Sequence, residues 1–211
     1  MDIHEYQAKE ILANFGVETQ PGALAYSPEQ AAYRARELGG DSWVVKAQVH
    51  AGGRGKVGGV KLCRSDHEIQ DACEGMFGQK LVTHQTGPAG KGIYRVYVEG
   101  AVPIEREIYL GLVLDRTSQR VMIVASSEGG MEIEDISADR PESIVRSTIE
   151  PAVGLQDFQA REIAFQLGLE PGQVQNMVRT LHGCYSARAL AYCTTCTCTL
   201  YQVVLLETFY K

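Results

Sequence analysis

The hydrophobic positions near the start of this chain follow the period of a helix. Ala8, Ile11, Leu12 and Phe15 recur at spacings of three and four residues. Side chains at this spacing share one helix face, so the pattern predicts an amphipathic helix over about residues 3–15. One face of that helix is expected to pack against a core.

Two further helices are predicted from cap signals. Ser27 precedes a proline and has Gln30 three residues later, and Ser65 has Glu68 three residues later. A serine followed at this spacing by Glu or Gln is typical of a capping box, and proline suits a first helical turn. Helices are therefore expected after both serines, the second reaching about residue 75.

β-Branched and alternating segments predict the strands. They are residues 43–45, a strand opening at 82–83, residues 94–99, a hairpin of 106–115 with 121–126, and residues 143–149. Helical periodicity returns over residues 160–167, and another helix is expected after Pro171. Strands and helices mix without a regular βαβ order, which predicts an α+β fold.

Composition and charge narrow the class of protein. The 211 residues carry a formal net charge of −6 and are 45% hydrophobic. This balance argues against a general nucleic-acid binder, and no apolar run is long enough for a membrane helix. No signal-peptide pattern is present, which predicts a cytoplasmic protein whose six cysteines are free thiols.

A glycine-rich segment carries the candidate chemistry. Five glycines fall within residues 52–59, together with Arg54 and Lys56, and Lys46 ends the preceding strand. Glycines let backbone N–H groups approach an anion, and the cations suit a polyphosphate. The spacing is not that of the common phosphate-binding loops. The alternative is a solvated basic hairpin tip that binds nothing.

Several segments, including the run VKAQVHAGGRGK, resemble the β subunit of succinate–CoA ligase: residues 1–9, 45–56, 81–87 and 160–169. The amino acids at residues 130–134 and 150–156 look closer still to those of the malate–CoA ligase branch. The likeness runs from residue 1 to about Cys184. It implies an ATP-grasp fold, with a small α/β lobe over about 20–95 and part of a larger lobe from 1–20 and 95–184.

The resemblance also implies a set of nucleotide-binding residues. The matching positions are Lys46, Gly53, Arg54, Gly55, Glu99, Val102 and Glu107. In the family the first four positions contact the phosphates of ATP, the next two lie in the hinge that receives adenine and ribose, and the last is a further nucleotide contact. The alternatives are a solvated lysine head at 46 and solvated strand-end carboxylates at 99 and 107.

The reaction implied by the resemblance is an ADP-forming ligation of CoA to succinate or malate. ATP phosphorylates a histidine of the partner α subunit, the acid becomes an acyl phosphate, and the CoA thiol displaces phosphate. His4 and His50 are therefore not expected to be phosphorylated, and no catalytic residue is assigned to this chain. Mg²⁺ is expected for the family, but its Asn and Asp ligands are missing from this sequence.

The resemblance stops before residues 185–211. This tail contains Cys193, Cys196 and Cys198. A metal or redox site is one alternative for these cysteines, although a fourth ligand at suitable spacing is lacking. We favour a shifted reading frame and a missing C-terminal CoA-ligase domain. This hypothesis predicts that another frame of the coding DNA encodes the family's Glu-Ile-Asn-Pro-Leu. Two alternatives are a truncated, inactive fragment with at most weak nucleotide binding, and an ATP-grasp ligase for a different substrate.

Overall fold

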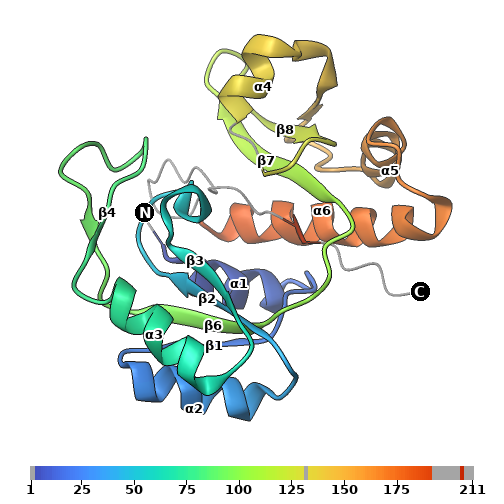
Figure 1. Cartoon of the computed structure of the whole chain (residues 1–211). Helices are drawn as coiled ribbons and strands as arrows, with labels where there is room; N and C mark the ends of the chain where they lie inside the picture. The colour runs from blue at the N-terminus through green and yellow to red at the C-terminus, as the bar shows by residue number, and fades with distance from the viewer. Residues whose placement is uncertain (1–2, 131–132, 192–204, 207–211) are drawn as a thin grey trace. The chain divides into compact units, whose positions relative to one another are not determined.

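The computed structural model describes residues 3–130, 133–191 and 205–206 of the chain (Figure 1). Helices and strands mix in an α+β fold, as the sequence predicts. The chain divides into two compact units. We call them the N-terminal unit, Asp2–Glu10 with Thr19–Val102, and the C-terminal unit, Ile11–Glu18 with Pro103–Lys211. The lobe boundaries expected from the resemblance stay a prediction.

The N-terminal unit is built on a four-stranded antiparallel sheet in the order β1-β6-β2-β3. Its strands are β1 (Gly22–Ala25), β6 (Val96–Gly100), β2 (Trp43–Ala47) and β3 (Val60–Cys63). Side chains alternate between the two faces of a strand. On one face Trp43, Val45 and Val98 pack against the apolar sides of α2 (Pro28–Leu38) and α3 (Asp66–Met76). The other face remains for polar side chains.

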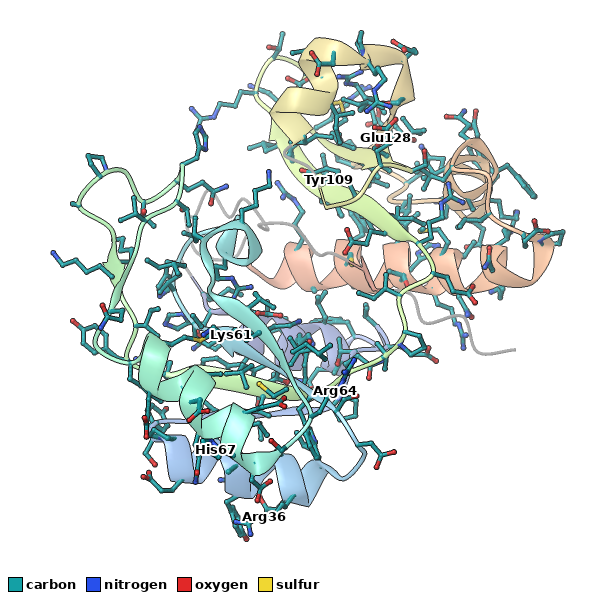
Figure 2. All side chains as sticks on the ribbon, in the orientation of Figure 1. Arg36, Lys61, Arg64, His67, Tyr109 and Glu128 are labelled. Atoms are coloured by element: carbon teal, nitrogen blue, oxygen red, sulfur yellow. The ribbon has the colours of Figure 1, made fainter. Side chains whose placement is uncertain are left out.

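Both predicted serine caps are confirmed. Ser27 Oγ accepts the Gln30 backbone N–H and Ser65 Oγ accepts the Glu68 backbone N–H, each at 3.2 Å. The reciprocal half of each box is shifted by one residue, because the Gln30 and Glu68 side chains accept from the residue before the serine. Figure 2 shows Arg36 at the end of α2, where an ion pair of 3.6 Å ties it to Asp66 of α3.

The C-terminal unit holds a second antiparallel sheet. Its order is β10-β7-β8-β9, with the bounds β10 (Leu205–Leu206), β7 (Glu107–Asp115), β8 (Arg120–Ser126) and β9 (Ile144–Ile149). Ile108 and Ile123 of this sheet are buried in one core with Ile163 and Met177, which belong to the last two helices of the unit. The helices of this unit are α4 (Ile133–Asp139), α5 (Asp157–Gln166) and α6 (Pro171–Ala191), with the short 3₁₀ turn η2 (Pro141–Ser143) between α4 and β9.

The strand expected at residues 82–83 is wrong. The chain instead forms the small pair β4 (Lys80–Leu81) and β5 (Lys91–Gly92), and a turn follows β4. Within that turn the Thr86 hydroxyl accepts the Thr83 N–H at 2.8 Å and the Thr83 hydroxyl accepts the Thr86 N–H at 3.3 Å. Threonine side chains that bond nearby backbone compete with a strand ladder, which explains the early end.

Three further predictions from the sequence concern the cysteines, the tail and membrane helices. Cys63, Cys73 and Cys184 are buried free thiols, as expected. The predicted tail begins inside α6, which continues to Ala191, and its cysteine motif lies outside the described residues. Among the helices that the structure describes, none is long and apolar enough to cross a membrane.

Candidate functional site

Two charged side chains share the polar face of the N-terminal sheet. Lys46 lies on β2 and Glu99 on β6, and the register pairs Val44 with Glu99 and Lys46 with Tyr97. Paired residues face the same side of a sheet, so Lys46 and Glu99 are diagonal neighbours. The face they share is opposite to the one that packs against α2 and α3. Ladder register therefore brings a cation and a carboxylate together from distant parts of the sequence.

Helix α1 (Glu5–Asn14) brings two more charges to this face. Glu5 and Lys9 are one helical turn apart, so they project from the same side of α1. Lys9 and Lys46 both form ion pairs with the Glu99 carboxylate, and Lys46 Nζ lies 3.2 Å from Glu5 Oε1. The Glu99 side chain is 3% exposed and that of Lys46 is 12% exposed. The group is therefore an almost buried ion network.

The glycine loop between β2 and β3 supplies the third cation. It contains the 3₁₀ turn η1 (Arg54–Val57). Gly53 precedes this turn and has a left-handed φ of +69°. A residue with a Cβ adopts this conformation only at a cost, so glycine suits the position. Arg54 donates from Nη1 to the Ala47 carbonyl at 2.7 Å and from Nη2 to Glu5 Oε2 at 2.6 Å. The guanidinium thus folds back toward the end of β2.

Two glutamines fasten the surrounding backbone. Buried Gln48 donates to Glu5 Oε2 at 3.3 Å, and its Oε1 accepts the Tyr6 N–H at 3.3 Å. Gln85, in the turn after β4, accepts the Gly52 N–H at 2.6 Å. The first contact holds the start of α1 against β2, and the second holds the first glycine of the loop.

The charges of the network stabilise one another. Burial raises the pKa of Glu5, but Arg54, Lys46 and Lys9 together outweigh it and lower that pKa to about 2. Burial lowers the pKa of Lys46, whereas Glu5 and Glu99 raise it, and the net shift is upward. Glu5 and Lys46 are therefore charged at neutral pH. With Lys9, Lys46 and Arg54 against Glu5 and Glu99, the formal charge of the network is +1.

The structure brings together three of the seven residues that the resemblance implied. Lys46, Arg54 and Glu99 belong to the ion network of the N-terminal unit, so the alternatives of a solvated Lys46 head and a solvated Glu99 are wrong. Gly53 and Gly55 lie in the loop above it. Their roles, and those of the other predicted positions, stay predictions.

The two remaining positions lie outside the network. Val102 follows β6 at the last position of the N-terminal unit. Glu107 opens β7 of the C-terminal unit, where its carbonyl accepts the Gly129 N–H at 3.0 Å. Gly129 and Gly130 lie so close to Glu107 that a Cβ on either would overlap it. Glu107 is thus closely surrounded by glycine backbone.

His4 and His50 form a pair beside the network. Their ring centroids are 3.9 Å apart. Burial, followed by the neighbouring His50, Arg95 and Arg54, lowers the pKa of His4 to about 4. His4 is therefore neutral at physiological pH, in a surrounding that already carries positive charge. This arrangement agrees with a packing role for the pair.

Four residues of this region are not among those predicted from the sequence, namely Glu5, Lys9, Gln48 and Gln85. Glu5 is 41 residues from Lys46 and 49 from Arg54 along the chain, and Lys9 is 90 from Glu99. No local pattern records such pairings. The available signal was that all four residues lie inside the segments that resemble the family, at 1–9, 45–56 and 81–87.

The sequence of this chain is similar to those of known CoA-ligase subunits. Probable malate–CoA ligase subunit β of Mesorhizobium japonicum is 62% identical over 185 residues, covering 88% of this chain and 47% of that protein. Succinate–CoA ligase [ADP-forming] subunit β of Bdellovibrio bacteriovorus is 50% identical over 194 residues, covering 92% and 50%. The chain spans about half the length of the curated relatives it matches.

Solved structures share the fold at low identity. Acetyl-coenzyme A synthetase 1 of Ca. Korarchaeum cryptofilum superimposes with a TM-score of 0.65 at 22% identity, over 87% of this chain and 79% of that chain. ATP citrate lyase of Methanothrix soehngenii gives 0.60 at 19% identity, over 89% and 43%. A family model described as an ATP-grasp domain matches residues 2–194. The chain therefore belongs to the ATP-grasp domain family.

Proposed function

We propose that this chain is the nucleotide-binding part of the β subunit of an ADP-forming acid–CoA ligase, and that its N-terminal unit binds the phosphates of ATP. The observation that carries this proposal is the convergence of Lys46 and Arg54 on one carboxylate beneath the glycine loop. Because both cations reach one carboxylate, their donors can also meet on the oxygens of one bound phosphate. The identity to malate– and succinate–CoA ligase β subunits supports the same assignment.

The residues of the N-terminal unit have separate roles in the proposed binding of the phosphates. The Lys46 ammonium offers a compact charge and Arg54 a forked donor to the phosphates. Gly53 and Gly55 let the loop backbone come close to phosphate oxygens. We assign the Glu99 carboxylate to holding Lys46 in place, because it already bridges two ammonium groups. Glu99 would then contribute to the hinge that receives adenine and ribose through its main chain, as we propose for Val102.

Glu107 is the proposed nucleotide contact of the C-terminal unit. A carboxylate accepts hydrogen bonds from ribose hydroxyls, and the glycines at 129 and 130 hold this residue closely. ATP supplies the phosphoryl group when it is bound. The residues of this chain bind and orient the nucleotide, and none of them is assigned to bond making.

We propose no metal ligands among these residues. Across residues 3–130, 133–191 and 205–206, no three His, Cys, Asp or Glu side chains gather closely enough to hold a metal ion. The donor set of the ion network is balanced by lysine and arginine, which does not suit a divalent cation. The ion network is therefore not proposed as the Mg²⁺ site, although the family is expected to use Mg²⁺.

The remaining parts of the proposed reaction belong to other components. A partner α subunit would supply the histidine that accepts the phosphoryl group and the CoA site, and the acid would be succinate or malate. Of the two relatives, one is named a malate–CoA ligase subunit and the other a succinate–CoA ligase subunit, which supports both acids. The proposed compartment is the cytoplasm.

Calorimetric titration with ATP, with and without Mg²⁺, tests this function. Saturable binding is expected for the wild type. Binding should weaken at least about tenfold in Lys46→Met, which keeps the length of the side chain and removes its charge-assisted contacts. Exposed Lys91→Met is the matched control and should bind as the wild type does. Folded wild-type protein that binds no ATP would overturn the proposal. Turnover with an α subunit then separates a working ligase from an inactive nucleotide binder.

A further inference from the structure

Glu5 occupies the place where the two proposed phosphate-binding cations meet. Its Oε1 lies 3.2 Å from Lys46 Nζ, and its Oε2 accepts from Arg54 Nη2 at 2.6 Å. Gln48 adds a third donor to this carboxylate, 3.3 Å from Oε2. A carboxylate presents two oxygens on one carbon, much as a phosphate presents its oxygens on one phosphorus. Glu5 therefore places an anion of the chain itself where the two cations meet.

The donors with which both cations reach one common anion are taken by Glu5. An ammonium has three N–H groups, and Lys46 directs two of them at the Glu5 and Glu99 carboxylates. Arg54 directs one nitrogen to the Ala47 carbonyl and another to Glu5. A phosphate that contacts both cations at these positions must take the place of a carboxylate. The two carboxylates differ in how easily they can leave.

Glu5 is the carboxylate that can be exchanged. The Glu99 side chain is 3% exposed on a central strand, whereas that of Glu5 is 20% exposed at the first residue of α1. A side chain at a helix start can turn toward solvent without breaking a helical hydrogen bond. Once released, the Glu5 carboxylate would be hydrated, and its two cations would face the ligand.

We propose that Glu5 is a specificity-determining residue, an internal counter-anion that reserves Lys46 and Arg54 for ligands with linked phosphates. The inference rests on the proposed function, because it names the residue that selects among anions at the same site. A single phosphate gains little by replacing a carboxylate that is already bridged. A polyphosphate replaces Glu5 and also reaches the backbone N–H groups of the glycine loop.

The full chain tests this inference with two probes, inorganic tripolyphosphate and orthophosphate, titrated by calorimetry without Mg²⁺ at constant low ionic strength. The variant is Glu5→Gln, which keeps the shape and removes the charge. We expect it to bind tripolyphosphate at least about tenfold more tightly than the wild type, the scale of one charge-assisted hydrogen bond. Orthophosphate should bind the variant measurably and the wild type hardly at all.

The control variant is Glu10→Gln, on the exposed side of the same helix. It makes the same change of charge and should leave both affinities unchanged, which separates local exchange from a general electrostatic effect. Wild type that binds tripolyphosphate, with Glu5→Gln binding it equally or more weakly, would overturn the inference and leave the proposed function intact. Absence of polyphosphate binding to every folded variant would overturn both.

A measurement on the wild type covers the case in which Glu5→Gln does not fold. Carboxyl-detected NMR of protein labelled at glutamate follows the side-chain carbons during a tripolyphosphate titration. Displacement from Lys46 and Arg54 should move the Glu5 signal in step with binding, and the Glu99 signal should move much less. A Glu5 signal that stays unchanged at saturation would show that the carboxylate keeps its place, contrary to the inference.

Discussion

The replacement Glu99→Gln tests whether the ion network holds the N-terminal unit together. The Glu99 carboxylate is 3% exposed and forms ion pairs with both Lys9 and Lys46. Glutamine keeps the shape of the side chain and removes its charge. Two ammonium groups would then face a neutral amide on a face that water hardly reaches, so we expect the unit to lose stability.

The structure sets the size of this loss. Breaking a buried ion pair by neutralising one partner costs about 3–5 kcal/mol. Lys46 keeps Glu5 at 3.2 Å, and the Lys9 side chain is 19% exposed, so the lower end applies. We expect the free energy of unfolding to fall by about 3 kcal/mol, which lowers the melting temperature by about 6–12 °C for a chain of this size.

Urea unfolding followed by tryptophan fluorescence measures this loss. Trp43 is the single tryptophan of the chain and lies buried in β2, so its signal reports on the N-terminal unit. Glu10→Gln, at an exposed position, is the matched control and should stay within about 0.5 kcal/mol of the wild type. A loss below about 1 kcal/mol for Glu99→Gln would refute the view that buried charge pairing holds this face together.

Two further changes test the surroundings of the network and the C-terminal unit. The pKa of His4 is about 4 in the folded chain and about 6.5 when unfolded. The unfolded state then binds more protons between these values, so stability should rise from pH 4 to pH 6.5 and this rise should flatten in His4→Gln, measured by urea unfolding across that range. Arg106 donates to the Leu167 and Gly168 carbonyls after α5, and Arg106→Ala should cost about 1–2 kcal/mol in thermal unfolding. Arg106→Lys should recover only part of that loss, whereas full recovery would contradict the need for a forked donor.

Local signals predicted the elements whose patterns are complete within a few residues. The serine caps at 27 and 65 and the hairpin of β7 with β8 are confirmed, because caps and alternation depend on near neighbours. Strand β1 was missed, since Gly22–Ala25 contains no β-branched residue and owes its place to pairing with β6. Tertiary pairing decides such segments, and a single sequence does not show it.

The candidate site was predictable only in part, for a related reason. The glycine loop and its cations stand together in the sequence, so Lys46 and Arg54 could be proposed as phosphate contacts, and this role stays a prediction. Their anionic partner could not, because Glu5 reaches them through the packing of α1 on the sheet. A basic glycine-rich loop suggests a free cationic surface, whereas the structure shows Lys46 and Arg54 already paired with Glu5. A ligand of this unit must therefore compete with the carboxylate of Glu5, and its affinity depends on that exchange as much as on the cations themselves.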